Sequence, residues 1–292
     1  MIASPMITSP LPDLDAWVAF FSEADLPVLR HTAQQLAELH INANKSNARV
    51  ISSVILHDPM MTLRVLAYIE AKRNKSRNTD ITTIERALMM IGMEPFFRDF
   101  QNLPLIEDQL KPHPRAMLGL LKVINRARKA TLWARDWAIY RHDLDVDEIM
   151  VATLLYDAAE ILMWSFAPQL ALDVSEKQKA DRTLRSMTVQ TEVFNISLYQ
   201  LKLALAQVWH LPELLTMLMN QDNANHPRVK NVKLAVDLAR HSANGWDDAA
   251  LPDDYKAIGE LLHLSEEAVM HRLGLDKPQM ISGTTGRETT GV

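Results

Sequence analysis

The chain has 292 residues, of which 31 are Lys or Arg and 36 are Asp or Glu, so its formal charge is −5 with His neutral. This balance argues against a protein that coats nucleic acid or binds membranes through a polybasic surface. The absence of cysteine excludes disulfides, thiolate nucleophiles and cysteine-ligated metals. Only 8 residues are glycine, too few for Gly-rich phosphate loops or a strand-dense fold, so the composition favours an all-α protein.

The two ends of the chain differ from the middle. Pro5, Pro10 and Pro12 break any helix near the start, so residues 1–13 are predicted to form an extended arm without the pattern of a signal peptide. Residues 276–292 are mostly small and polar and are predicted to be disordered. No uncharged apolar run has the length of a membrane span, and we expect no membrane association.

Between the ends, apolar residues recur with a helical period. The predicted helices are Leu29–Ile41, Ala48–His57, Pro59–Lys72, Ile84–Ile91, Arg115–Tyr140, Asp147–Phe166, Arg182–Trp209, Pro212–Asn220, Val229–Ser242, Asp254–Leu262 and Glu266–Leu273. Three of them have a start signal. Asp58 precedes Pro59, and Thr82 and Asp145 each stand three residues before a Glu, so these residues are predicted N-caps.

These segments predict one all-α unit over residues 14–275. The proline-rich stretch Asn102–Pro114 is the predicted seam within it. It separates a smaller N-terminal helical layer, about 14–103, from a larger helical bundle, about 115–275.

The histidines give no sign of a metal site. None of the 10 stands three or four residues from another, the spacing that brings two imidazoles to one metal. The acidic stretch that begins at Asp143 starts like a calcium loop, but Glu148 stands where glycine is needed and Leu154 where a bidentate Glu is needed. We therefore expect no metal and no cofactor.

Two acidic residues interrupt the most apolar segment, Ile149–Trp164. Asp157 and Glu160 are three residues apart and share one side of a helix that other helices should enclose. A buried carboxylate needs a cation, hydrogen-bond donors or a proton. The pair indicates either a ligand or relic metal pocket, or a solvated Glu160 with Asp157 capping a neighbouring backbone. Asp237 lies beside an apolar helix face and, taken alone, is typical of a surface residue.

A cation is available on the helix predicted at Arg115–Tyr140. Arg126 flanks its apolar stripe, on the same edge as Ala130, Trp133 and Trp137. An Arg at the edge of a close helix contact can pair with a carboxylate in a fork geometry. The alternative is a surface Arg that only covers apolar neighbours with its stem.

The order of these segments resembles the HDOD family, the HD-related output domain of bacterial signalling proteins, over roughly Leu26–Leu273. The resemblance lies in DLPVLRHTAQQLAEL, VISSVILHDPMMTLRVL, ITTIERALMMIGMEPF and VWHLPELL, in that order. It implies an all-α fold, an HD-domain-like helical bundle with a smaller N-terminal layer, related to the HD metal-dependent phosphohydrolases. Those enzymes bind the metal through a His, a later His-Asp pair and a distant Asp.

The resemblance also implies that the metal set has degenerated. Arg126 falls at or next to the first His, and Tyr156-Asp157 falls where His-Asp would stand. Ala159 and Glu160 replace the usual Gly and Lys, so only Asp157 and Asp237 remain in ligand positions. Two carboxylates without imidazoles are a poor transition-metal site. The resemblance implies that an Arg126–Asp157 salt bridge replaces the metal site, with Tyr156 and Asp237 completing its hydrogen bonds. If the alignment of this segment slips by two residues, Arg128 or Lys129 would reach Asp157 instead.

The expected function is a cytoplasmic, non-catalytic signalling or regulatory module that binds a partner protein or a small ligand. The candidate pocket residues are Arg126, Tyr156, Asp157, Glu160 and Asp237. Nucleic acid is not an expected partner, and a homo-oligomer is compatible with the sequence. The alternative is a metal-dependent phosphohydrolase acting on nucleotides or cyclic dinucleotides. In a third interpretation, a helical adaptor, methionines such as Met60 and Met89 would form partner surfaces rather than core.

Overall fold

The computed structural model describes residues 5–42, 46–72, 81–181 and 183–275. Within these residues every regular element is a helix, and the single bridge between extended segments joins Val28 to Leu105. The all-α prediction is therefore confirmed. The predicted disordered tail, residues 276–292, and the first four residues of the predicted arm lie outside the described residues.

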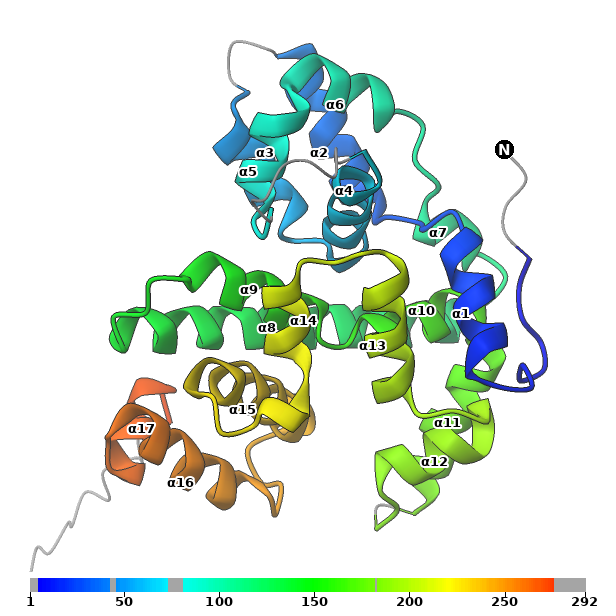
Figure 1. Cartoon of the computed structure of the whole chain (residues 1–292). Helices are drawn as coiled ribbons and strands as arrows, with labels where there is room; N and C mark the ends of the chain where they lie inside the picture. The colour runs from blue at the N-terminus through cyan, green and yellow to red at the C-terminus, as the bar shows by residue number, and fades with distance from the viewer. Residues whose placement is uncertain (1–4, 43–45, 73–80, 182, 276–292) are drawn as a thin grey trace, which may run out of the picture.

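A small group of helices forms the upper layer of the molecule in Figure 1. The helices of this layer are α2 (Arg30–Ile41), α3 (Ala48–Ile55), α4 (Pro59–Lys72), α5 (Ile84–Ile91) and α6 (Met93–Asp99). Helix α4 is enclosed on almost all sides, because it packs against its own layer and against the bundle below. Its Met60 and Met61 are fully buried and belong to the core, whereas Met89 on α5 is 65% exposed.

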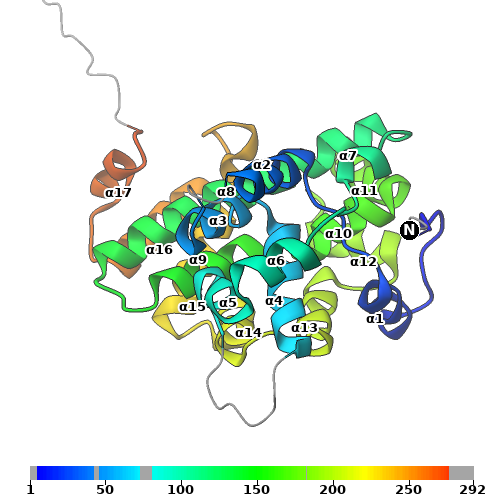
Figure 2. The ribbon, with the colours of Figure 1, turned by 90° about the horizontal axis from the view of Figure 1, so that it is seen from above.

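The larger bundle is built along one long helix, α8 (Pro114–Tyr140). Its other helices are α9 (Val146–Leu155), α10 (Ala158–Phe166), α11 (Pro168–Ala180), α12 (Ser186–Phe194), α13 (Leu198–Val208), α14 (Glu213–Met219), α15 (Pro227–His241), α16 (Leu251–Leu262) and α17 (Glu266–Arg272). Helices α9 and α15 both pack along α8, while α16 and α17 lie beyond α15 at the end far from the upper layer (Figures 1 and 2).

The first helix belongs spatially with the bundle. Helix α1 (Leu14–Glu23) packs against α13, and the Trp17 indole donates a hydrogen bond of 3.0 Å to the carbonyl of Phe194. The segment before it is extended, as predicted, and the amide of Ile7 donates to the carbonyl of Phe166 at 2.7 Å. The short helix α7 (Ile106–Gln109) follows the connection from the upper layer, where Val28 and Leu105 pair.

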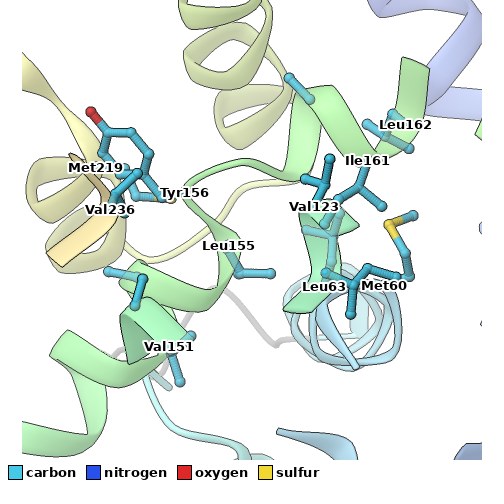
Figure 3. Packing of buried hydrophobic residues seen from close by; sticks show 14 of the residues in the cluster. Met60, Leu63, Val123, Val151, Leu155, Tyr156, Ile161, Leu162, Met219 and Val236 are labelled. Atoms are coloured by element: carbon cyan, nitrogen blue, oxygen red, sulfur yellow. The ribbon is translucent and has the colours of Figure 1, made fainter. Parts of the chain in front are cut away.

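A continuous apolar core joins the layer and the bundle. Met60 and Leu63 of α4 extend toward Val123 of α8 and Ile161 of α10, as Figure 3 shows. The stretch Val146–Phe166 is long and apolar enough to span a membrane. However, 89% of its most apolar part is buried against other helices of this fold. Burial against neighbouring helices accounts for its apolar character.

Two predicted helices are wrong in extent. The segment predicted as Asp147–Phe166 is broken by a turn at Tyr156 and Asp157, which ends α9 and begins α10. The segment predicted as Arg182–Trp209 is two helices, because Asn195 adopts the left-handed conformation, φ 62°, and ends α12. The prediction missed α1, α6, α7 and α11.

Of the three predicted N-caps, Asp58 is correct, whereas Thr82 and Asp145 make no capping hydrogen bond. Asp58 accepts hydrogen bonds from the amides of Met60 at 2.9 Å and Met61 at 3.1 Å, as expected of a cap. The cap of α5 is Thr83 rather than Thr82, whose hydroxyl donates to Glu148 instead. Asp145 stands at the N-cap position of α9 but makes no side-chain capping bond, since it pairs with Arg228.

Candidate functional site

The candidate pocket residues come from α8, from the turn between α9 and α10, and from α15. The turn places Asp157 at the start of α10 with backbone angles φ −96° and ψ 19°. Arg126 lies in the middle of α8, which packs on both α9 and α10. The break in the predicted helix therefore points a carboxylate toward the centre of α8.

Arg126 is the centre of the site. Its Nε and Nη2 lie 3.2 and 2.8 Å from Oδ2 of Asp157, and Nη2 also lies 2.6 Å from Oε2 of Glu160. The three side chains are only 15%, 9% and 25% exposed. The predicted Arg126–Asp157 salt bridge is confirmed, and Glu160 joins it rather than remaining a separate solvated residue.

Electrostatics within this cluster favour the charged forms. Burial opposes ionisation of Asp157, but the guanidinium groups of Arg126 and Arg240 outweigh it and hold the pKa of Asp157 below its usual value. Burial likewise opposes the charge of Arg126, and the two carboxylates outweigh it and raise the pKa of Arg126. Asp157 and Arg126 are therefore both charged at neutral pH.

Arg240 on α15 is a second cation at Asp157. Its Nη2 lies 3.5 Å from Oδ1 of Asp157, and its Nη1 lies 3.8 Å from Oδ1 of Asp237. Asp237 also pairs with Lys233 one turn earlier. The prediction that Asp237 completes the hydrogen bonds of the Arg126–Asp157 pair is therefore wrong: Arg240 stands between the two carboxylates and contacts both.

The hydroxyl of Tyr156 bonds to a residue outside the Arg126–Asp157 pair. Its hydroxyl accepts a hydrogen bond of 2.7 Å from the side-chain amide of Gln221, so the prediction that it bonds to the Arg126–Asp157 pair is also wrong. Burial raises the pKa of Tyr156 to about 12. Its ring is covered by the Lys202 ammonium, whose Nζ lies 3.4 Å from the ring centroid.

Arg240 and Lys202 are the residues that the sequence prediction missed. Lys202 had a signal, because it shares the apolar stripe of α13 with Leu198, Leu201 and Leu205 and so had to be buried. No signal in the sequence marks Arg240. Its side chain is 40% exposed, and it reaches Asp157 only because α15 packs on α8 and α9.

The alternative alignment, in which Arg128 or Lys129 would pair with Asp157, does not agree with the structure. Arg128 donates from Nε to the carbonyl of His57 at 2.6 Å, toward the upper layer. Lys129 lies 4.7 and 4.8 Å from the ring centroids of Trp133 and Trp246. Arg126 is thus the α8 cation that reaches Asp157.

The residues at this position do not fit a catalytic metal. In an HD-type site two imidazoles and two carboxylates hold the metal, whereas the resemblance described above implies Arg126 and Tyr156 at the two His positions. The guanidinium already pairs with Asp157 and Glu160. Among the described residues no group of three His, Asp or Glu side chains has a geometry that would hold a metal ion. We therefore derive no metal-dependent step.

Comparison with known proteins gives the family. The HDOD domain model matches residues 26–225. The response regulator MmoQ from Methylococcus capsulatus str. Bath has a similar structure, with a TM-score of 0.63, 16% identity, and coverage of 88% of this chain and 100% of that chain.

A virulence factor from Campylobacter jejuni subsp. jejuni is also similar in structure, with a TM-score of 0.60, 16% identity, and coverage of 90% of this chain and 93% of that chain. No curated protein matches the sequence. At such low identity these structures show a shared fold, and the family model covers more than half of the sequence. The chain belongs to the HDOD family.

Proposed function

We propose that the chain is a cytoplasmic signalling or regulatory module of bacterial type that catalyses no hydrolysis and acts by binding a partner protein or a small ligand. Membership of the HDOD family supports the regulatory part of this proposal. So does the structural likeness to a protein described as a response regulator.

One observation carries the non-catalytic part. The Arg126 guanidinium contacts Asp157 at 2.8 Å and Glu160 at 2.6 Å, and the family resemblance implies that HD hydrolases hold their metal at this position. Those hydrolases take their nucleophile from metal-bound water. An Arg retains its proton at all physiological pH values and offers no open coordination position, so it stabilises the carboxylates without activating water.

The test is an assay of phosphate-ester hydrolysis with added metal. Nucleoside monophosphates, nucleoside diphosphates, cyclic nucleotides and cyclic dinucleotides are incubated with the protein and with manganese, nickel or iron. We expect no turnover above the protein-free control. Turnover that requires metal and disappears in Asp157→Asn, a variant that keeps the shape of the side chain, would contradict the proposal and support the phosphohydrolase alternative.

The binding part is tested separately by thermal stability. A ligand present at a hundred times its dissociation constant adds about 2.7 kcal/mol to the free energy of unfolding. We expect a small molecule or a partner protein to raise the melting temperature while no product forms. If the melting temperature of the correctly folded protein rises with none of the tested small molecules or partner proteins, only a structural adaptor role remains. That result would contradict this proposal.

A further inference from the structure

Helix α8 carries a row of exposed apolar side chains on the side that faces away from the core. Leu118, Leu132 and Ile139 are 63%, 65% and 47% exposed. Their positions follow a spacing of seven residues, in which the exposed Asn125 fills the remaining position. Because two turns of an α-helix take about seven residues, these side chains lie in one narrow row along the helix. We call Leu118, Asn125, Leu132 and Ile139 the α8 stripe.

Basic side chains flank the α8 stripe on both sides. Lys122 and Lys129 each stand four residues after a stripe position, on one flank. Arg128 and Arg135 each stand three residues after a stripe position, on the other flank. The whole helix has six Lys or Arg and one Asp, in a chain whose formal charge is −5. Positive charge is therefore concentrated on α8, against the balance of the chain.

These flanking cations are not neutralised by the fold. Among the described residues, none of the four forms an ion pair with a carboxylate, and Lys122 and Arg135 are exposed. Arg128 donates to the carbonyl of His57, which has no full charge. Lys129 lies over two indole rings. All four charges therefore remain available to an acidic partner.

The α8 stripe lies beside both parts of the fold. Figure 1 shows α8 between the upper layer and helices α15 to α17. On one flank Arg128 reaches His57, in the connection between α3 and α4. On the other flank Lys129 reaches Ser242 at 3.4 Å and the ring of Trp246, both just after α15. A partner on the stripe would contact side chains that are tied to both parts, so its affinity would depend on how the two parts pack.

We infer that the α8 stripe binds an acidic amphipathic helix of a partner protein. The apolar side chains of that helix cover Leu118, Leu132 and Ile139, and its Asp and Glu side chains pair with Lys122 and Arg135. Complementary charge favours this occupant and speeds its approach. A second copy of the same face is disfavoured, because it would bring cations against cations. The inference deepens the proposed function and rests on its binding part, because it names the class of partner.

An anionic membrane surface has the same charge as the inferred partner, but the shape of the stripe does not suit it. A helix that binds in a membrane interface has a broad apolar face. The α8 stripe is one residue wide, is interrupted by the polar Asn125, and has charged side chains on both flanks. A partner helix needs only a narrow row of apolar anchors at helical spacing, which the stripe provides.

Fluorescence anisotropy of the full chain with a labelled designed peptide tests the inference. The peptide has about four heptads, with Leu at positions a and d and Glu at positions e and g, and its control has Lys in place of Glu. We expect the chain to bind the Glu peptide, and to bind the Lys peptide at least about tenfold more weakly. Added salt should weaken binding of the Glu peptide, because the flanking cations are exposed and their pairs are screened.

Variants on and off the stripe locate the binding. Leu132→Ser should weaken Glu-peptide binding at least about tenfold, because it removes an apolar anchor. Met89→Ser should not, although Met89, on α5, is equally exposed. The double charge reversal Lys122→Glu with Arg135→Glu should also weaken binding at least about tenfold. Lys179→Glu, at an exposed lysine on α11, should not. Circular dichroism of each variant checks that its helices are intact, as expected for changes at exposed positions.

Three results would each overturn the inference. They are no binding of the Glu peptide, equal binding of the Glu and Lys peptides, and full binding by Leu132→Ser. Sedimentation with phosphatidylglycerol vesicles adds a fourth test, in which we expect no binding. Vesicle binding that the double charge reversal abolishes would overturn the inference in favour of a membrane surface. Failure in any of these tests leaves the hydrolysis assay and the melting-temperature test, and thus the proposed function, unaffected.

Discussion

At the scale of single residues, the contact between Arg126 and Asp157 is the one most open to measurement. Asp157→Ala removes a buried partner of a permanent cation, so we expect it to lower the free energy of unfolding by about 3 kcal/mol. The cost stays in the lower part of the usual range because Glu160 still contacts Arg126 at 2.6 Å. Combining Asp157→Ala with Arg126→Leu should recover much of the loss, since no guanidinium is then left without its partner. Urea unfolding of the single and double variants measures this.

An exposed ion pair provides the control. Arg272 and Asp136 form two bonds of 2.6 and 2.9 Å, with geometry as good as that of the buried pair, but both side chains are open to solvent. Asp136→Ala should therefore cost no more than about 1 kcal/mol. Equal losses for Asp136→Ala and Asp157→Ala, or a double variant no more stable than Asp157→Ala, would show that burial of the Arg126 pair has no energetic role.

Lys202 makes stability depend on pH in a defined direction. Its pKa is about 7 in the fold and about 10.4 in an unfolded chain. Between these values the unfolded chain holds a proton that the folded chain has released, so the folded state gains stability as the pH rises. Relative to Lys202→Met, the free energy of unfolding should increase by up to about 1.4 kcal/mol per pH unit above pH 7. Parallel pH profiles for the two proteins, from urea unfolding, would contradict this.

At the scale of elements, Asp58 connects helices of the upper layer. Besides capping α4, its Oδ2 accepts a hydrogen bond of 2.8 Å from the amide of Leu29, just before α2. The side chain is fully buried, and burial raises its pKa although these amides favour the charged form. Asp58→Ala leaves three amides without their acceptor, so we expect a loss of about 2–4 kcal/mol in the free energy of unfolding.

A simple N-cap gives the comparison for Asp58. Asp13 caps α1 through one bond of 2.9 Å to the amide of Ala16 at the surface. Asp13→Ala should cost about 1 kcal/mol. Thermal or urea unfolding that ranks Asp13→Ala as the more damaging change would show that Asp58 is only a local cap.

Local signals explain which elements the sequence predicts. Asp58 followed by Pro59 predicts the start of α4, because a cap and a proline act on the nearest turn. The break at Tyr156 and Asp157 carries no Gly or Pro, and the ion pairs that fix Asp157 come from α8 and α15, so no local pattern reveals it. Helix α11 had a signal in Pro168 at its first turn and Lys177 near its end.

At the scale of the whole molecule, the site lies where three parts of the fold meet. Arg126 comes from α8, Asp157 from the turn before α10, and Arg240 from α15, and these helices meet in the bundle (Figure 1). Lys202 comes from α13 and lies near Leu63 of α4. The HDOD resemblance placed Arg126 opposite Asp157 because matched segments fix which helices pack together. It did not identify Arg240 or Lys202, since neither stands at a position of the metal set.

The central claim is that a guanidinium has replaced a metal at Asp157, and elemental analysis tests it most directly. The protein is expressed with added manganese, iron and zinc, purified without chelator, and compared with Asp157→Asn by inductively coupled plasma mass spectrometry. The account predicts that both proteins carry far less than one metal ion per chain, at the same level. Near-stoichiometric metal in the unaltered protein that is lost in Asp157→Asn would contradict it.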